Sequence, residues 1–343
     1  MAKRYLVFLY SKYFFLILFS LTLFFVGLDF LQVFKKLPNS ANLQVLYLTY
    51  KAMNGIDILF PISLVFAMIS LKISLIRSNE LVAFYALGIG KKAIIFPLFI
   101  TAVALTMVYL ILHLTSFTYA DEYANNIKKY NSVMNTTKNL FFKYNNSYVY
   151  FKRLLPLDRS AEGVRVFEVN GTNIKKIVLA DHADFKQNYW HITKASVIER
   201  LKERISIKET SLDTLVGYKP KILDSVYEGK TNISLLDAIY ALKLFQSQKI
   251  DISKLKAVIL FHLFYPFFAP LLMIVIFYFV PVSARIANLN LFSFGAILST
   301  LVVWGVLYSF VKLAFAGSLQ PEIAIVAPIL ILALIAFYFY KKF

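Results

Sequence analysis

Six long apolar runs constrain the fold of this sequence more than any other feature. They cover residues 13–34, 57–76, 93–117, 257–280, 291–314 and 323–340. A helix needs about 20 consecutive apolar residues to cross a hydrocarbon core of roughly 30 Å, and each run is near that length. Because hydrophobic residues also make up 59% of the chain, the sequence predicts a multi-pass helical membrane protein. The runs are grouped as three, a long interval and three.

Basic residues near the ends of the runs predict the orientation, because Lys and Arg in short loops are retained in the cytoplasm. The first run is too long for a signal-peptide core, so we expect it to remain as a span. With both termini inside, the cytoplasmic segments contain Lys3, Arg4, Lys12, Arg77, Lys91, Lys92, Arg285, Lys341 and Lys342. The chain has a formal net charge of +18, which is spread along the membrane flanks and the middle region. Because this charge does not form a basic stripe, a nucleic-acid partner is not expected.

Acidic residues are scarce outside the long interval, where only Asp29, Asp57, Glu80 and Glu322 occur. In the predicted topology Glu80 is the only one of them in the cytoplasm. Three lysines run against the charge rule, because Lys35, Lys36 and Lys51 fall in the predicted outer loop between the first two runs. Lys72, near one end of the second run, is expected to extend its charge to the membrane interface.

The interval between the third and fourth runs has the local patterns of β-strands. Residues 147–154 and 163–170 are rich in β-branched and aromatic residues, and Asn170-Gly171 is a tight-turn signal. Residues 183–192 predict a hairpin, with Phe185 and Trp190 on its two arms. Residues 197–207 fit a helix or a strand equally well. Several short strands at this spacing predict a small β-sandwich or barrel.

Residues 234–249 predict an amphipathic helix just before the fourth run. Ser234 and Asp237 form a capping box, and one face carries Leu235, Ile239, Leu242 and Phe245. Such a helix fits the outer membrane–water interface. Packing on the β domain is the alternative.

Sequence motifs for catalysis are missing. No GxxxxGK[ST], HExxH or GxSxG pattern occurs, and the chain has no Cys. The four histidines are scattered, with His182 and His191 on opposite arms of the predicted hairpin and His262 inside the fourth run. We therefore expect no catalytic residue, no metal site and no cofactor. His262 is either a functional group within the membrane or a histidine bonded to a neighbouring carbonyl.

A short helix is predicted in the cytoplasmic stretch SNELVAFYALGIGKK, residues 78–92. Ser78 or Asn79 can cap its start, Glu80 then lies in the first turn, and Gly88 supplies a left-handed stop. The helix would offer Leu81, Val82, Phe84 and Tyr85. Apolar residues on a cytoplasmic knob fit docking into the groove of a partner, with Glu80 offered to a basic residue. Otherwise Glu80 stabilises only its own helix and the apolar side chains dip into the lipid interface.

The stretch LIRSNELVAFYALGIGKK resembles the coupling-helix signature of the lipopolysaccharide transport permeases, the LptF and LptG family. The likeness extends over nearly the whole chain, including residues 4–6, the strand-like segments, residues 234–267 and the last two runs, which look more like LptG than LptF. Two departures are Asn79, which separates Ser78 from Glu80, and His262, where members often carry a basic residue.

This resemblance implies six transmembrane helices with a periplasmic β-jelly-roll domain inserted between helices 3 and 4. It divides the chain into residues 1–117 with a coupling helix at 78–88, the jelly roll at 118–232, and an interfacial helix with the last three spans at 233–343. It implies a permease subunit of an ABC exporter in the inner membrane, which extracts lipopolysaccharide and passes it to a periplasmic bridge. ATP hydrolysis would belong to a separate subunit, so the chain itself is not an enzyme.

The same resemblance assigns partners and site residues. The partners are a paired LptF-like permease, an LptB-like ATPase dimer, and LptC-like and LptA-like proteins. Coupling to the ATPase is assigned to Glu80, Leu81, Val82, Phe84, Tyr85 and Gly88. Lys35 and Lys36, and with less support from position Lys312, become candidates for the phosphates of lipid A and the inner core, because Lys suits phosphate as a point charge. Anchoring on lipid headgroups is the alternative for these lysines.

Two other classes of protein remain open on the residues alone. One is another ABC permease that exports a lipid or a lipoprotein, although six spans are more than such permeases usually have. The other is a membrane-bound enzyme acting on lipid or peptidoglycan, for which no nucleophile or metal set is present.

Overall fold

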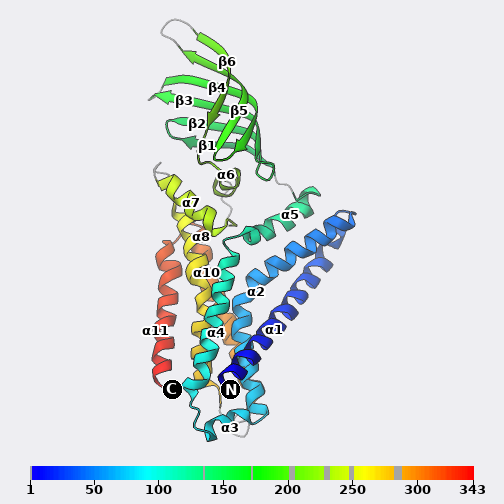
Figure 1. The fold of residues 1–343 in the computed structure, drawn as a ribbon, viewed down its shortest axis with the longest axis vertical. Coiled ribbons are helices and arrows are strands. Elements are labelled where there is room, and N and C mark those ends of the chain that lie inside the picture. The colour runs from blue at the N-terminus through cyan, green and yellow to red at the C-terminus, as the bar shows by residue number, and fades with distance from the viewer. Residues whose placement is uncertain are drawn as a thin grey trace. The chain divides into compact units, whose positions relative to one another are not determined.

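The computed structural model describes residues 2–133, 136–170, 173–200, 205–227, 232–246, 251–281 and 288–343. The chain divides into two compact units. A helical unit consists of Met1–Lys35, Leu48–Ala120 and Lys256–Phe343, and a second unit consists of Lys36–Tyr47 and Asp121–Leu255. Each is described separately below, and Figure 1 shows their elements.

Six segments of the helical unit are long and apolar enough to cross a membrane, which confirms the predicted number and grouping among the described residues. They are α1 (Ala2–Val33), α2 (Ala41–Arg77), α4 (Lys91–Leu112), α8 to α9, α10 (Leu289–Phe315), and the π-helical turn η4 (Glu322–Val326) with α11 (Ala327–Lys341). In the sequence, the β-strands of the second unit come between the third and fourth of these spans, as predicted.

The fourth span is interrupted near its middle. It consists of α8 (Ser253–Phe264), the 3-10 turn η3 (Tyr265–Phe267) and α9 (Phe268–Phe279). Pro266 lies in the 3-10 turn. Because proline has no backbone N–H and its ring clashes with the preceding turn, it kinks or breaks an α-helix, and here the helix breaks. The fourth span is therefore two helices joined at a proline.

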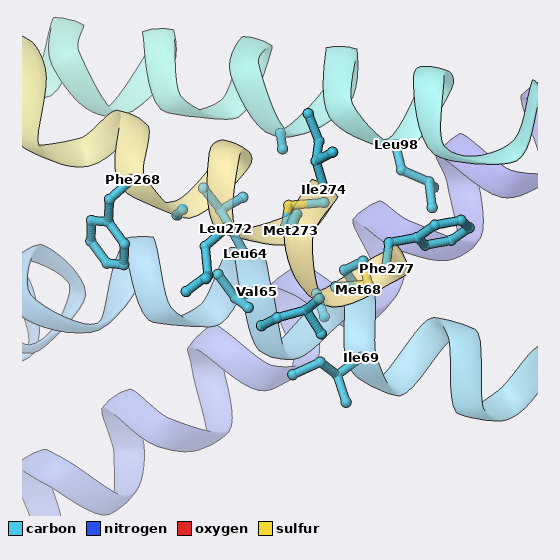
Figure 2. Packing of buried hydrophobic residues seen from close by; sticks show 14 of the residues in the cluster. Leu64, Val65, Met68, Ile69, Leu98, Phe268, Leu272, Met273, Ile274 and Phe277 are labelled. Atoms are coloured by element: carbon cyan, nitrogen blue, oxygen red, sulfur yellow. The ribbon is translucent and has the colours of Figure 1, made fainter. Parts of the chain in front are cut away.

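The core of the helical unit includes side chains of α2, α4 and α9, which lie close together in Figure 2, and extends to α10 and α11. Leu64 and Met68 of α2 are buried there with Met273 and Phe277 of α9. The first helix joins this core through one narrow stripe, in which every fourth residue is buried: Leu6, Tyr10, Phe14 and Leu18. The Tyr10 hydroxyl donates to the Leu64 carbonyl at 3.0 Å, so α1 is also fixed to α2 by a hydrogen bond.

The second helix is much longer than the sequence predicts. It begins at Ala41, so Lys51 lies within α2 and the prediction that it lies in a loop is wrong. The helix contains no proline before Pro61, which lies inside it. Gly55 allows α1 to pack closely against α2, since a Cβ at this position would lie 2.8 Å from the Phe25 ring. The Lys51 ammonium reaches Asp29 of α1 at 3.3 Å, which gives this lysine a partner inside the helical unit.

The described residues of the second unit contain one antiparallel sheet of six strands, in which each strand pairs with its neighbours in sequence. The strands are β1 (Thr137–Tyr144), β2 (Ser147–Leu155), β3 (Ser160–Asn170), β4 (Asn173–Lys186), β5 (Tyr189–Arg200) and β6 (Ile205–Thr214). This up-and-down order, visible in Figure 1, differs from the Greek-key order of a jelly roll. Short connections keep consecutive strands together, so the predicted β domain is present with the strand order of a meander.

Local strand predictions are confirmed where the residues are described. Residues 147–154 fall in β2, and 163–170 fall in β3. The hairpin of residues 183–192 is present, with Phe185 opposite Trp190 across β4 and β5. The ambiguous segment 197–207 contains the end of β5 and the start of β6, but its residues 201–204, like Gly171 of the predicted turn and Arg285, lie outside the described residues.

Three helices accompany the sheet: α5 (Ala120–Tyr130), α6 (Pro220–Tyr227) and α7 (Leu235–Gln246). The predicted cap of α7 is present, because the Asp237 N–H donates to Ser234 Oγ at 3.2 Å. Its buried face consists of Leu235, Ala238, Ala241 and Phe245, whereas Ile239 is 36% exposed.

The contacts of α7 favour the alternative that the sequence left open. The ring of Phe245 lies 5.9 Å from that of Tyr218, and the Tyr240 hydroxyl donates to Asn188 in the turn between β4 and β5 at 3.3 Å. The buried face of α7 is thus packed within the β-sheet unit. The opposite face leaves Leu236 57% exposed.

Trp190 joins the sheet to the helices that cover it. It is fully buried, its Nε1–H donates to the Tyr218 carbonyl at 2.8 Å, and its ring lies 5.0 Å from Phe151 and 5.6 Å from Phe185. A buried carbonyl that loses its donor costs free energy in addition to the cavity left by a smaller ring.

We therefore predict that Trp190→Phe destabilises the β-sheet unit by roughly 2–4 kcal/mol, the sum of an unsatisfied carbonyl and a partial cavity. Hydrogen exchange of the β4 and β5 amides in the full-length protein would measure the loss. Tyr189→Phe, at the neighbouring position where β5 begins, is the control and should change the opening free energy by less than about 0.5 kcal/mol. Equal effects of the two substitutions would contradict this role of Trp190.

Candidate functional site

A short helix, α3 (Glu80–Ala86), lies between α2 and α4 at the end of the helical unit that also carries both termini (Figure 1). Its end is a Schellman motif. Gly88 has a φ of 75°, its N–H donates to the Tyr85 carbonyl at 3.0 Å, and the Ile89 N–H donates to the Phe84 carbonyl at 2.9 Å. The predicted left-handed stop at Gly88 is confirmed.

The start of α3 differs from the prediction. Asn79 is left-handed with a φ of 61°, and no side chain caps the helix, so the predicted capping by Ser78 or Asn79 is wrong. The Ser78 hydroxyl instead donates to Glu80 Oε1 at 2.9 Å, and the Tyr5 hydroxyl of α1 donates to Glu80 Oε2 at 2.9 Å. The carboxylate is thus held in place by two hydroxyls, one of them from a distant part of the chain.

The apolar residues of α3 divide into an inner and an outer set. Leu81 is fully buried, and Phe84 and Tyr85 pack partly buried against the core of the helical unit. Val82 is 43% exposed and Leu87 is 77% exposed. Leu87 lies inside the helix predicted at residues 78–88 but was not among the residues that the sequence assigned to docking. Any partner that approaches α3 therefore meets Val82 and Leu87 first.

The candidate substrate lysines lie on different helices. Lys35 and Lys36 belong to the 3-10 turn η1 (Phe34–Lys36) that follows α1, and both are exposed. Lys312, also exposed, lies in the last turn of α10, with its ammonium 5.0 Å from the centre of the Tyr308 ring. Within the described residues none of the three forms an ion pair, so their charges are available to an anion.

A polar cluster that the sequence did not reveal lies in the helical unit. His113, at the end of α4, is 1% exposed, and its Nε2 lies 2.9 Å from Asp57 Oδ1 of α2. Tyr109 donates to the same carboxylate oxygen at 2.7 Å. The imidazole of His262 on α8 is in ring contact with His113, with centroids 4.4 Å apart. Asp57, the neighbouring pair Tyr109 and His113, and His262 are 52 or more positions apart in the sequence, so only the tertiary fold brings them together.

Lys72 also departs from its prediction. It is 1% exposed, so it does not extend to the interface. Its ammonium donates to the Phe277 carbonyl in the last turn of α9 at 2.8 Å and lies 3.4 Å from the centre of the Phe277 ring. The carbonyls of a helix's last turn have no intrahelical donor, so a buried lysine satisfies one of them. Lys72 thereby ties α2 to the end of the fourth span.

The histidines of the sheet pair with nearby carboxylates. His182 lies 3.0 Å from Asp184, and His191 lies 2.6 Å from Asp213. Within the described ranges no group of three or more His, Asp or Glu side chains is placed to hold a metal ion.

The fold and this arrangement define a multi-pass helical membrane protein that carries a β domain between its third and fourth spans. A family model described as "Lipopolysaccharide export system permease LptF/LptG" matches residues 4–342, so the chain belongs to the LptF/LptG family. No curated protein matches the chain. Family membership makes it a permease of the lipopolysaccharide export system in the inner membrane, a transporter subunit rather than an enzyme.

The Asp57 cluster yields a stability prediction. Asp57→Asn keeps the shape of the side chain but removes the charge that faces His113, and hydrogen bonds to charged groups contribute about 1.5–3 kcal/mol. We expect a loss of roughly that size in the free energy of unfolding, measured in mixed micelles of detergent and lipid.

Glu322→Gln is the matched control, because Glu322 pairs with Lys256 at 3.7 Å with both side chains about half exposed. Exposed pairs contribute roughly 0–1 kcal/mol, so this variant should unfold almost like the parent protein. A larger loss for Glu322→Gln than for Asp57→Asn would show that the buried cluster is not a main stabilising contact.

Proposed function

We propose that this chain is a transmembrane permease of an ABC exporter that extracts lipopolysaccharide from the inner membrane and passes it to a periplasmic bridge. The observation that carries the proposal is α3, a short helix between two spans whose Glu80 is fixed by Tyr5 and Ser78. The family match supports the cargo and the exporter class. The chain has no phosphate-loop motif, so ATP hydrolysis falls to a separate LptB-like dimer.

The orientation proposed is that of the sequence, with both termini and α3 in the cytoplasm and the β-sheet unit in the periplasm. The basic residues near α3 and the termini support it, because Lys and Arg are retained inside. The complex would also contain a paired LptF-like permease and the LptC-like and LptA-like proteins of the bridge. Within the family we assign the chain to the LptG type, on the character of its last two spans.

The coupling surface we propose consists of Glu80, Val82 and Leu87. Val82 and Leu87 are the exposed apolar side chains of α3 and its end, suited to a groove on the ATPase. Leu81, Phe84 and Tyr85, which face the core, anchor the helix, and Gly88 ends it. Movement of the ATPase would thus reach α2 and α4 through a helix held firmly on its inner side.

The proposed substrate contacts are Lys35 and Lys36, with Lys312 as a further candidate. All three are exposed, and Lys binds phosphate as a compact point charge. The phosphates of lipid A and the inner core are the matching groups on the cargo.

For the coupling surface, we predict that Glu80→Lys reduces co-purification of the ATPase by about tenfold or more, because reversing a charge at a docking contact leaves two like charges facing each other. Val82→Asp combined with Leu87→Asp should act in the same direction by placing charge in an apolar groove. Pull-down of the ATPase with the tagged permease measures both.

Tyr5→Phe separates docking from positioning. It removes one hydrogen-bond donor to the Glu80 carboxylate but leaves the charge of Glu80 and the exposed side chains of Val82 and Leu87 unchanged. If Glu80 docks on the ATPase, Tyr5→Phe keeps most of the association. A loss as large as that of Glu80→Lys, or full association in Glu80→Lys, would return Glu80 to a role within its own helix.

For the substrate contacts, Lys35→Glu combined with Lys36→Glu should lower photo-cross-linking of lipopolysaccharide by about tenfold, since each charge-assisted phosphate contact contributes roughly 1.5–3 kcal/mol. The adjacent pair Lys128 and Lys129 on α5, changed in the same way, is the control and should leave cross-linking near the parent level. Unchanged cross-linking in the first variant would favour anchoring of Lys35 and Lys36 on lipid headgroups.

A further inference from the structure

A hollow of about 430 Å³ lies beside the coupling helix in the helical unit. It is lined by Tyr85 of α3, the backbone of residues 88–90, Lys91 at the start of α4, and Lys342 and Phe343 at the end of the chain. The lining therefore combines two ammonium groups with aromatic rings and glycine backbone. The residues of the proposed coupling surface, Glu80, Val82 and Leu87, do not line it.

The lysines around the hollow are not paired with acidic side chains in the described part of the chain. Within the described residues neither Lys91 nor Lys342 forms an ion pair, and the same holds for Lys92 and Lys341. Buried Lys72 is linked to the lining through Phe277, whose ring lies 5.6 Å from that of Phe343. A cluster of positive charge attracts an anion.

Glu80, the one acid predicted on this side, does not neutralise the cluster. Its two oxygens accept hydrogen bonds from Tyr5 and Ser78, and no described lysine reaches it. Glu80 therefore pairs with hydroxyl groups and not with the lysines of the hollow.

Tyr85 lines the hollow and carries a hydroxyl group. Its hydroxyl oxygen is buried and has no hydrogen-bond partner within the described residues. Burial raises the pKa of the Tyr85 hydroxyl, so the group keeps its proton and remains a donor. A buried hydroxyl without a partner costs free energy, which an acceptor in the hollow would recover.

The rings around the lysines are those of a membrane interface. Lys91 lies over Tyr278 at 5.8 Å, Lys92 over Tyr340 at 5.7 Å, and Lys342 over Tyr338 at 4.4 Å. Tyrosines and lysines together are typical of the level of the lipid headgroups, and basic pockets between spans on the cytoplasmic side bind anionic headgroups.

Apolar surface continues from the lysines along the same helices. Phe96 of α4 is 51% exposed and Phe337 of α11 is 57% exposed. Acyl chains can lie against such side chains while a headgroup occupies the hollow, which a soluble anion or an acidic protein segment does not require.

We propose that this hollow binds the phosphate headgroup of an anionic phospholipid of the cytoplasmic leaflet, with Lys91 and Lys342 pairing with the phosphate oxygens and Tyr85 donating to them. The site rests on the proposed orientation, with α3 in the cytoplasm. The site is separate from the lysines proposed for lipopolysaccharide. Lys35 and Lys36 lie in η1, and Lys312 lies in the last turn of α10. The other end of α10 is the one near α3, because Asn290 there accepts a hydrogen bond from Arg77, the last residue of α2.

The test is native mass spectrometry of the full-length permease with its partner subunits, released from nanodiscs of phosphatidylethanolamine that contain phosphatidylglycerol or cardiolipin. Anionic lipid should be retained over phosphatidylethanolamine. Lys91→Gln combined with Lys342→Gln should reduce retention by about fivefold or more, and Tyr85→Phe by roughly two- to threefold. Lys91→Arg with Lys342→Arg should restore it, because the charge is kept.

Lys3→Gln combined with Lys12→Gln is the matched control, with the same loss of charge on the same predicted side of the membrane, and should retain lipid like the parent. Equal retention by the Lys91 and Lys342 glutamine variant and the parent would overturn the proposal. Displacement of the lipid by inorganic phosphate, with phosphate itself bound by the parent and not by the variant, would assign the hollow to free phosphate.

A protein occupant would give a third result. Amine labelling of Lys91 and Lys342 would then be blocked by addition of the ATPase and unaffected by anionic lipid, which would also overturn the proposal. Lipid retention is measured without ATP or lipopolysaccharide, so its failure leaves the proposed export function intact. Loss of ATPase association, in turn, does not prevent the measurement of lipid retention.

Discussion

Inside a bilayer no water is available to satisfy polar groups, so a polar side chain buried in a span is stabilised by a partner from the protein. At three places the structure meets this constraint by joining two helices. Lys72 of α2 bonds the last turn of α9, Asp57 of α2 meets His113 at the end of α4, and Tyr10 of α1 bonds the Leu64 carbonyl. Each contact involves α2, which makes this helix the centre of the unit. Its C-terminal end leads directly into α3.

Patterns along the chain were sufficient for the parts of the fold that depend on local sequence. The six spans, the strands with the hairpin at Phe185 and Trp190, and the stop at Gly88 were predictable, because hydrophobic length, alternation and turn chemistry act over a few residues. The start of α3 was not. Its predicted cap failed because the Ser78 hydroxyl bonds Glu80, whose other oxygen is held by a tyrosine 75 residues away.

Contacts between distant segments account for the other differences. A helical period shows which residues share a face but not what covers that face, so α7 was compatible with both a membrane surface and a β-sheet. The same limit applies to α3, where Leu81 is buried and Val82 is exposed although both are apolar. A lone lysine or histidine in a span signals that a partner exists, and only the packed structure shows that the partner is a carbonyl for Lys72 and a carboxylate for His113.

The break at Pro266 has a mechanical consequence for the fourth span. Its two halves are fastened to different neighbours, since His262 of α8 contacts His113 and the Phe277 carbonyl of α9 accepts from Lys72. Bending at the 3-10 turn between α8 and α9 changes the separation of these two contacts without breaking either one. The angle at Pro266 can therefore change while α9 keeps its bond to Lys72 and α8 keeps its ring contact with His113.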